Sequence, residues 1–400
     1  MYSTKGFKVK EHYIFEVIIN AIPQWYEGKI DGSVCTININ GIDFYIGSHK
    51  RLTPQLGRLY DYICDNINNW LEKYPDILSS SNRKEITQEL TVYWLNGKNS
   101  CIDWYKFISY SEELLFRTYE NIPVTTNLII YPGNSGGQDI TDPRIQKVID
   151  PLATSMQTYL AVDENANFIS YEQIDWAEIS DTVGYKFSPE FLQPFTSKLQ
   201  EREYSFHVTT KGDVIILDMR GLLAAYRKGR WYIYDSATLK NSIVSIAGDY
   251  TVGCNIFEML LDLSYKRHGA LLIYDPSHAV LNKVVNTESI VDNSKSSDIV
   301  RMMLAPSVSC LGIGNNRSSD RKKRILLELA SMDGAVIFDN SKILSFGSMI
   351  ATHPKTGSYI GARTTAFESA FLHGGKPFKV SSDGDISLRF GSDTNIINFL

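Results

Sequence analysis

A single carboxylate stands between apolar residues near the C-terminal end of the sequence, where residues 331–339 read SMDGAVIFD. This pattern predicts a buried strand with one charged group, Asp333, at its mouth. Because a buried carboxylate without a partner is costly, we expect a cation, a metal ion or several hydrogen-bond donors beside Asp333. Gly334 and Ala335 would leave the backbone almost bare, so that a flat ligand could approach it. A lone Asp-Gly-Ala run is by itself more typical of a turn into a core strand.

Three further segments give this run its context. Residues 264–274 read SYKRHGALLIY, which predicts a helix end followed by an apolar strand. Residues 359–366 read YIGARTTA and open a helix-like run that reaches His373. Residues 377–387 read PFKVSSDGDIS, which predicts a strand, a turn and the start of another strand. The C-terminal part of the chain therefore alternates helix, strand and turn signals, as an α/β domain does.

The order of these segments resembles that of the diadenylate cyclase domain family, over roughly residues 245–392. That family carries S-x-x-R-x-G-A-L before a hydrophobic strand, then D-G-A, then G-T-R-H-R, and finally V-S-x-x-x-G-x-I-S. The resemblance implies an α/β fold with a mixed sheet flanked by helices. It also implies a diadenylate cyclase that condenses two ATP molecules into cyclic di-AMP or a related cyclic dinucleotide.

The third motif departs from the family pattern. Where the family has G-T-R-H-R, this chain has Gly361, Ala362, Arg363, Thr364 and Thr365. In the family the basic residues of this motif bind the triphosphate, so only one of three such groups is kept. Candidates for a replacement cation are Lys355 and the basic run at 317–324.

By this resemblance, Asp333 would bind Mg²⁺ or Mn²⁺ and help to deprotonate a 3′-hydroxyl. Arg363 would grip phosphate oxygens in a forked geometry. The other candidate nucleotide-binding residues are Gly334, Ala335, Gly361, Ala362, Thr364, Thr365, Ser381 and Leu271. His268 and His353 are weaker candidates. Because each domain of the family supplies one nucleotide, the resemblance also implies a homodimer or a larger homo-oligomer.

Two alternatives to a cyclase stay open. A degenerate cyclase domain could bind a nucleotide and act as a sensor or regulatory module without synthesis. An α/β scaffold could also use the same fold for protein contacts.

The rest of the chain is expected to form two further parts. Residues 1–125 predict an N-terminal α/β domain with a helix over 56–74, and their many aromatic residues are more typical of a core than of a ligand groove. Residues 126–245 predict a linker followed by a small β-rich module of two hairpins, which resembles the sensor region preceding some diadenylate cyclases. The glycine-rich run at 132–139 lacks the Gly-Lys-Ser/Thr ending of a P-loop, so we interpret it as a flexible loop or linker. Residues 246–400 would be the cyclase-like domain.

Composition narrows the function classes. The net charge of −5 gives no positive field for nucleic acid. The five cysteines are scattered and form no CxxC pair, which argues against a zinc knuckle or a disulfide framework and fits a reducing cytoplasm. No apolar stretch approaches the ~20 residues that span a bilayer, and the polar N-terminus does not have the pattern of a signal peptide. We therefore expect a cytoplasmic protein without a membrane or nucleic-acid partner.

Overall fold

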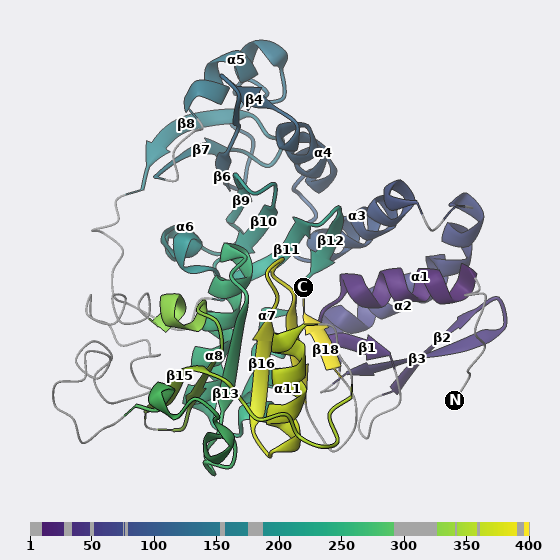
Figure 1. Ribbon diagram of the computed structural model, residues 1–400. Helices are drawn as coiled ribbons and strands as arrows, with labels where there is room; N and C mark the ends of the chain where they lie inside the picture. Colours follow the sequence, from purple (N-terminus) through teal and green to yellow (C-terminus); the bar gives the residue numbers. More distant parts are fainter. Residues whose placement is uncertain are drawn as a thin grey trace. The chain divides into compact units, whose positions relative to one another are not determined.

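The computed structural model describes residues 10–27, 34–48, 52–74, 76, 79–152, 157–174, 187–291, 326–340, 342–357, 361–389 and 396–399. The chain divides into two compact units. Unit 1 comprises Met1–Ser180 and Lys186–Ser236, and unit 2 comprises Asp181–Tyr185 and Ala237–Leu400. Each unit is a mixed sheet with helices, so the predicted α/β fold class is confirmed (Figure 1). The three-part division with boundaries at 125 and 245 stays a prediction.

Unit 1 contains a three-stranded sheet, a seven-stranded sheet and a short two-stranded ribbon. Its elements are α1 (Lys10–Ala21), β1 (Trp25–Glu27), β2 (Val34–Ile39), β3 (Ile42–Ser48), α2 (Pro54–Lys73), α3 (Ser80–Asn96), α4 (Trp104–Leu115), β4 (Thr118–Tyr119), β5 (Ile122–Pro123), β6 (Thr126–Ile130), α5 (Pro143–Leu152), β7 (Thr158–Val162), β8 (Phe168–Gln173), η1 (Glu190–Leu192), α6 (Gln193–Lys198), β9 (Tyr204–Val208), β10 (Val214–Asp218), β11 (Gly221–Arg227) and β12 (Arg230–Ile233).

Local sequence signals place the first elements of unit 1. Asn40 and Gly41 both have positive φ, as a two-residue hairpin turn requires, and they join β2 to β3. Helix α2 begins where the hydroxyl of Thr53 accepts a hydrogen bond from the amide of Leu56, at 3.3 Å. The helix predicted over 56–74 is therefore confirmed as α2.

The seven-stranded sheet contains both predicted hairpins. Its order is β12-β11-β10-β9-β6-β7-β8, and only the β6–β7 pair is parallel. The two predicted hairpins are confirmed as β9–β10 and β11–β12, and β9 also pairs with β6. Strand β6, residues 126–130, is therefore an interior strand of this sheet. This pairing joins segments about 75 residues apart, which no local pattern reveals.

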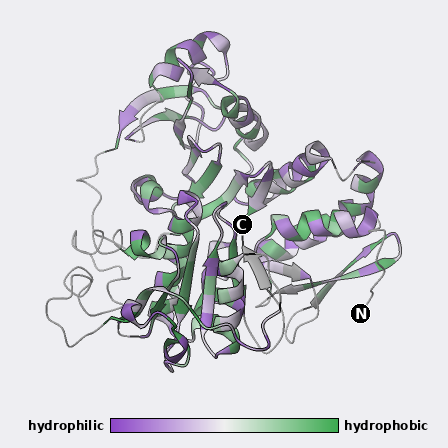
Figure 2. Cartoon of the chain, viewed as in Figure 1, coloured by the Kyte–Doolittle hydropathy of each residue, from purple (hydrophilic) through white to green (hydrophobic). Residues whose placement is uncertain are grey.

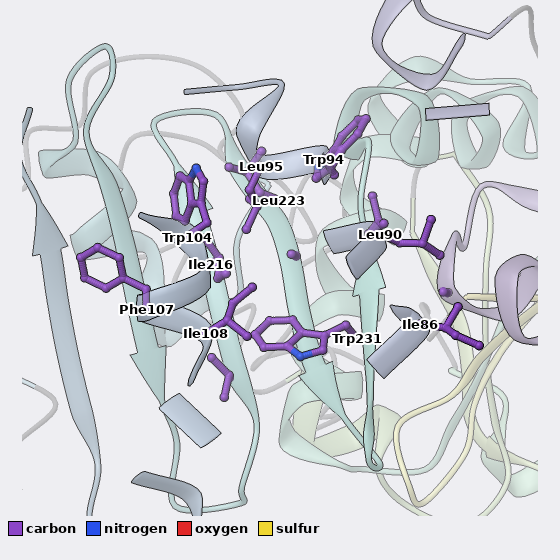
Figure 3. Close-up of a cluster of buried hydrophobic side chains, with 14 of the residues drawn as sticks. Ile86, Leu90, Trp94, Leu95, Trp104, Phe107, Ile108, Ile216, Leu223 and Trp231 are labelled. Atoms are coloured by element: carbon purple, nitrogen blue, oxygen red, sulfur yellow. The ribbon is translucent and has the colours of Figure 1, made fainter. Parts of the chain in front are cut away.

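Aromatic side chains fill the core of unit 1, as expected. Figure 3 shows α3 and α4 side chains packed against those of β10 to β12. The labelled residues are Ile86, Leu90, Trp94, Leu95, Trp104, Phe107, Ile108, Ile216, Leu223 and Trp231, all of them buried.

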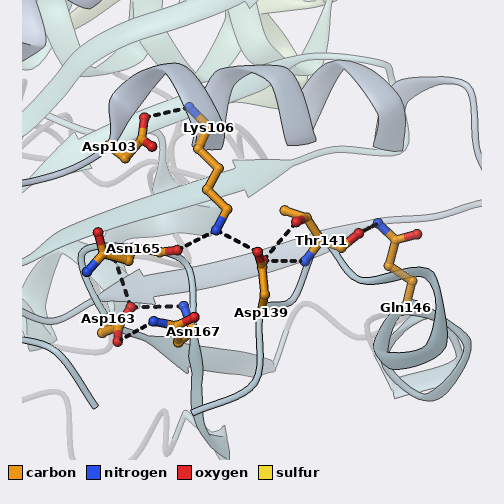
Figure 4. A network of polar contacts seen from close by, with 8 residues as sticks. All are labelled: Asp103, Lys106, Asp139, Thr141, Gln146, Asp163, Asn165 and Asn167. Atoms are coloured by element: carbon orange, nitrogen blue, oxygen red, sulfur yellow. Dashed lines mark hydrogen bonds and ion pairs between the residues drawn. The ribbon is translucent and has the colours of Figure 1, made fainter. Parts of the chain in front are cut away.

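The glycine-rich loop of unit 1 is held by a polar network, part of which is drawn in Figure 4. The buried carboxylate of Asp163 accepts hydrogen bonds from the amide and hydroxyl of Ser135, at 2.8 and 2.9 Å. Lys106 bridges Asp139 and the carbonyl of Asn165, both at 2.7 Å. The run is therefore a loop, as predicted, and these bonds hold it to the turn between β7 and β8.

Unit 2 is built on one six-stranded mixed sheet of order β15-β14-β13-β16-β17-β18, in which only β13 and β14 are parallel. Its elements are α7 (Ser236–Ala247), α8 (Tyr250–Lys266), β13 (Ala270–Tyr274), η2 (Leu281–Lys283), η3 (Thr287–Ser289), β14 (Ala335–Phe338), β15 (Ile343–Ser348), α11 (Ala362–Leu372), β16 (Lys376–Val380), β17 (Ile386–Arg389) and β18 (Ile396–Phe399). The strands predicted over 270–274 and 377–381 are confirmed as β13 and β16.

Strand β13 is buried throughout, and Figure 2 shows it as predominantly hydrophobic. Leu271 and Ile273 of β13 belong to a core cluster with Ala335 of β14 and with Phe367 and Ala370 of α11. This cluster fixes α11 against the sheet. Among the described residues, no helix is long and apolar enough to cross a membrane.

Gly334 comes just before β14, and its bare backbone faces β15 instead of an open space. Its φ is +100°, and a Cβ there would lie 2.3 Å from the carbonyl carbon of Gly347. The neighbouring strand therefore occupies the Cβ direction of Gly334, and contact of this backbone with a ligand stays a prediction.

We predict that Gly334→Ala destabilises the protein more than Gly361→Ala. Gly361 has almost the same φ, +102°, but a Cβ there would meet nothing within 4 Å. Backbone strain should cost about 1–3 kcal/mol in both variants, and the clash with β15 should add about 1–3 kcal/mol at Gly334 only. Urea denaturation measures the free energy of unfolding of the two variants. Equal losses of stability would contradict the close approach of Gly334 to Gly347.

Candidate functional site

The N-terminal end of α11 is the centre of the candidate site. Gly361 precedes the helix with φ 102° and ψ 135°, and no side chain caps the helix there. The carbonyl of Gly361 accepts bonds from the amides of Thr364 and Thr365, both at 3.2 Å. The amides of Ala362 and Arg363 precede the first intrahelical bond of an α-helix, so this end presents backbone donors and the positive end of the helix dipole.

Arg363 lies in the first turn of α11 and is about one-third exposed. Its guanidinium lies against Gly269, where a Cβ would be only 2.5 Å from Nη1 and 3.4 Å from the amide nitrogen of Ser382. Any larger residue at position 269 would displace the guanidinium. In the part of the chain that the structure describes, the buried Nε atom of Arg363 has no hydrogen-bond partner. These contacts leave part of the arginine fork unused.

Asp333 is brought to Arg363 from 30 residues earlier in the chain. Its Oδ1 lies 3.4 Å from Nη2 of Arg363. The cation expected beside Asp333 is therefore present, but the expectation of a buried carboxylate is wrong, since the Asp333 side chain is fully exposed. The turn before β14 carries it into solvent, and only Ala335 to Phe338 enter the sheet interior.

A second cation, Lys379 of β16, was not among the residues that the sequence singled out. Its Nζ lies 3.3 Å from the hydroxyl of Thr364 and 5.7 Å from the ring centroid of Phe367, both on α11. Burial lowers the pKa of Lys379, while Asp385 and Asp383 act in the opposite direction. The available signal was a charged residue between two apolar ones in a predicted strand, Phe378 and Val380.

Several predicted binding residues have structural contacts instead. The Ser381 hydroxyl donates to Asp383 at 2.5 Å and accepts from the Asp385 amide at 2.8 Å, which closes the turn between β16 and β17. Leu271 and Ala335 are buried in the core cluster. The hydroxyl of Thr365 donates to the carbonyl of Gly361 at 3.3 Å. Direct contact of these residues with a nucleotide stays a prediction.

The weaker candidates lie in other contacts. His268 Nδ1 is 3.0 Å from the hydroxyl of Ser331. His353 accepts a hydrogen bond from the amide of Lys355 at 3.1 Å, and its ring packs edge-on against His373 at 4.9 Å. Partial burial, together with His373 and nearby lysines, lowers the pKa of His353. The basic run at 317–324 lies outside the described residues.

A divalent metal ion fits this site only when it is bound together with the phosphate groups of the substrate. The described residues contain no cluster of three His, Cys, Asp or Glu side chains that could hold a metal ion. Asp333 offers one exposed carboxylate, and Mg²⁺ in nucleotide sites commonly uses one or two carboxylates together with phosphate oxygens and water. Asp333 would hold such an ion, whose charge would neutralise phosphate oxygens.

We predict that Asp333→Asn changes the free energy of unfolding by less than about 1 kcal/mol, because an exposed ion pair contributes little. Asp275→Asn is the matched comparison, since that buried carboxylate accepts bonds from the amides of Ala279, Val280 and Leu281 at 2.8–3.0 Å. It should cost about 2 kcal/mol or more. Chemical denaturation of both variants measures this, and a similar loss in each would mean that Asp333 has a structural role.

Comparisons with known proteins give limited information. No family model and no curated protein matches the chain. A crystal structure of a double mutant of DacA from Staphylococcus aureus, a diadenylate cyclase, is 19% identical, covers 40% of this chain and 89% of that chain, and has a TM-score of 0.24. A hypothetical membrane spanning protein from Bacillus cereus is 14% identical, covers 41% of this chain and 75% of that chain, and has a TM-score of 0.23. At such TM-scores, neither similarity adds to what the residues of the site indicate.

Proposed function

We propose that unit 2 binds a nucleoside triphosphate at the N-terminal end of α11 and acts as a diadenylate cyclase-type nucleotidyltransferase. The observation that carries the proposal is the position of Arg363, between the uncapped start of α11, Gly269 and Asp333. These groups come from three of the segments whose order resembles the cyclase family. The product would be cyclic di-AMP or a related cyclic dinucleotide.

Two independent sources of positive charge favour a phosphate at this position. Uncapped helix N-termini bind anions through their free amides and their dipole. The Arg363 guanidinium can form forked bonds to phosphate oxygens, and its present ion pair is a single 3.4 Å contact to an exposed carboxylate. Such an exposed pair is weak, so a multiply charged phosphate can displace Asp333 from Arg363 at little cost.

The carboxylate released in this way has a role in the chemistry. In each transfer step the 3′-hydroxyl oxygen of one nucleotide attacks the α-phosphorus of the other, and pyrophosphate leaves. The hydroxyl proton must go to a base, and Asp333 is the carboxylate beside Arg363. A metal ion bound to the triphosphate would supply charge neutralisation.

Closing the ring takes two such steps and two nucleotides. One copy of unit 2 contains one such site, so two copies must face each other with their nucleotides aligned. We therefore propose a homodimer or larger homo-oligomer as the active form.

A second candidate function is nucleotide binding without synthesis. Thr364 and Thr365 favour it, since they offer hydroxyl donors without charge where the family pattern has basic residues. The experiments below separate the two functions.

We predict that the full-length protein converts ATP into a cyclic dinucleotide in the presence of Mn²⁺ or Mg²⁺, and that Asp333→Asn removes this synthesis while keeping the fold. Liquid chromatography with mass spectrometry detects the product, and circular dichroism checks the fold. ATP binding without product from the wild type would favour the second function. Unchanged synthesis by Asp333→Asn would rule out Asp333 as the base.

We predict that Arg363→Ala lowers the affinity for a non-hydrolysable ATP analogue about ten- to hundredfold, because it removes charge-assisted hydrogen bonds. The loss should be smaller for AMP, which lacks the outer phosphates. Arg144→Ala is the control, since that exposed arginine of unit 1 pairs with Asp142 at 2.7 Å and the same charge is lost. Calorimetric titration measures these affinities. Equal affinities of the wild type and Arg363→Ala for the ATP analogue would mean that the triphosphate binds elsewhere.

A further inference from the structure

We propose that Lys379 of β16 supplies the second phosphate-binding cation of this site, in place of the basic side chains that α11 lacks at positions 364 and 365. The inference rests on the proposed function. It assigns a role to a residue outside the four sequence motifs, and it makes neither Lys355 nor the run at 317–324 necessary as a replacement.

Strand register directs Lys379 toward α11. Lys379 pairs with Leu271 of β13, and directly paired residues of neighbouring strands point to the same face of a sheet. Leu271 packs in the cluster that contains Phe367 of α11. Lys379 therefore lies on the face that α11 covers, and its Nζ reaches the first turn of that helix at Thr364, at 3.3 Å.

The size of Thr364 allows this approach. The hydroxyl of Thr364 accepts a hydrogen bond from the Lys379 ammonium. A histidine or arginine at position 364 would bring a much larger side chain, and another positive charge, to the place where the ammonium now lies. The chain thus keeps a cation beside the helix start but carries it on the neighbouring strand.

The charges around Lys379 point to an anion as its missing partner. Within the described part of the chain, no carboxylate lies within ion-pair distance of its ammonium, and the carboxylates of Asp383 and Asp385 act on it only from farther away. Half-burying an ammonium beside the positive end of a helix is unfavourable without an anion. Lys376 of the same strand differs, because its ammonium donates to the carbonyl of Ala247 at 2.8 Å and lies over the Tyr274 ring.

A bound phosphate would remove this conflict. It would accept hydrogen bonds from Lys379, Arg363 and the free amides of α11 together, and its negative charge would offset all three positive groups. In the free protein, the uncompensated charge of Lys379 lowers the free energy of unfolding. Binding-site residues commonly have such a stability cost when their ligand is absent.

The test is calorimetric titration of the full-length protein with Mg²⁺ and α,β-methylene-ATP, and separately with adenosine. Lys379→Met should weaken binding of the triphosphate about ten- to hundredfold, leave adenosine unchanged, and give a melting temperature no lower than that of the wild type. Lys379→Arg should retain most of the affinity. Lys376→Met and Lys355→Met remove the same charge elsewhere and should change triphosphate affinity by less than about threefold.

A charge-relocation variant gives an independent readout. Thr364→His with Thr365→Arg, introduced into Lys379→Met, should restore triphosphate affinity, because it returns the cations to the helix. If Lys379 had only a structural role, Lys379→Met would lower the stability of the protein. The two substitutions on α11 would then not restore triphosphate affinity.

The outcomes separate this inference from the function on which it rests. Triphosphate binding that depends on Arg363 but is unchanged in Lys379→Met would overturn the role of Lys379 and leave the proposed function intact. A greater loss in Lys355→Met than in Lys379→Met would overturn it as well. No triphosphate binding by the wild type would reject the proposed function and this inference together.

Discussion

The packing of α11 against β13 and β16 is the interaction on which the candidate site depends. Phe367 and Ala370 of the helix bury themselves against Leu271 and Ile273 of β13, and this apolar contact fixes where the helix begins. Arg363 and Thr364 are positioned from that starting point, whereas Asp333 comes from the turn before β14 and Lys379 from β16. Gly269 completes the arrangement by leaving room for the Arg363 guanidinium.

That packing gathers positive charge without fully compensating it. Arg363 lies in the first turn of α11 and Lys379 contacts Thr364 of that turn, whereas the carboxylate of Asp333 that pairs with Arg363 is exposed. By comparison, the buried carboxylate of Asp275 accepts hydrogen bonds from three backbone amides, and Glu368 pairs with Arg389. Local conflict of this kind is typical of functional sites.

Unit 1 shows the opposite arrangement. Its glycine-rich loop looks suitable for phosphate in composition, but the carboxylate of Asp163 accepts the bonds of the Ser135 amide and hydroxyl. A phosphate would have to compete with that buried carboxylate and tolerate its negative charge. The loop is therefore a structural element, and the positive site in unit 2 is the better place for a phosphate.

The sequence by itself determined the elements, because turns, caps and apolar periodicity act between near neighbours. Asn40–Gly41 specifies a hairpin, Thr53 begins α2, and the apolar runs at 270–274 and 335–338 become buried strands. The order of the motifs also indicated that Asp333 and Arg363 belong to one site. Tertiary structure decided which groups meet: β6 pairs with β9, Gly334 faces β15, Asp333 lies in solvent, and Lys379 reaches Thr364. These outcomes depend on strand pairing between distant segments, and register is set by the burial of whole faces, which no local signal records.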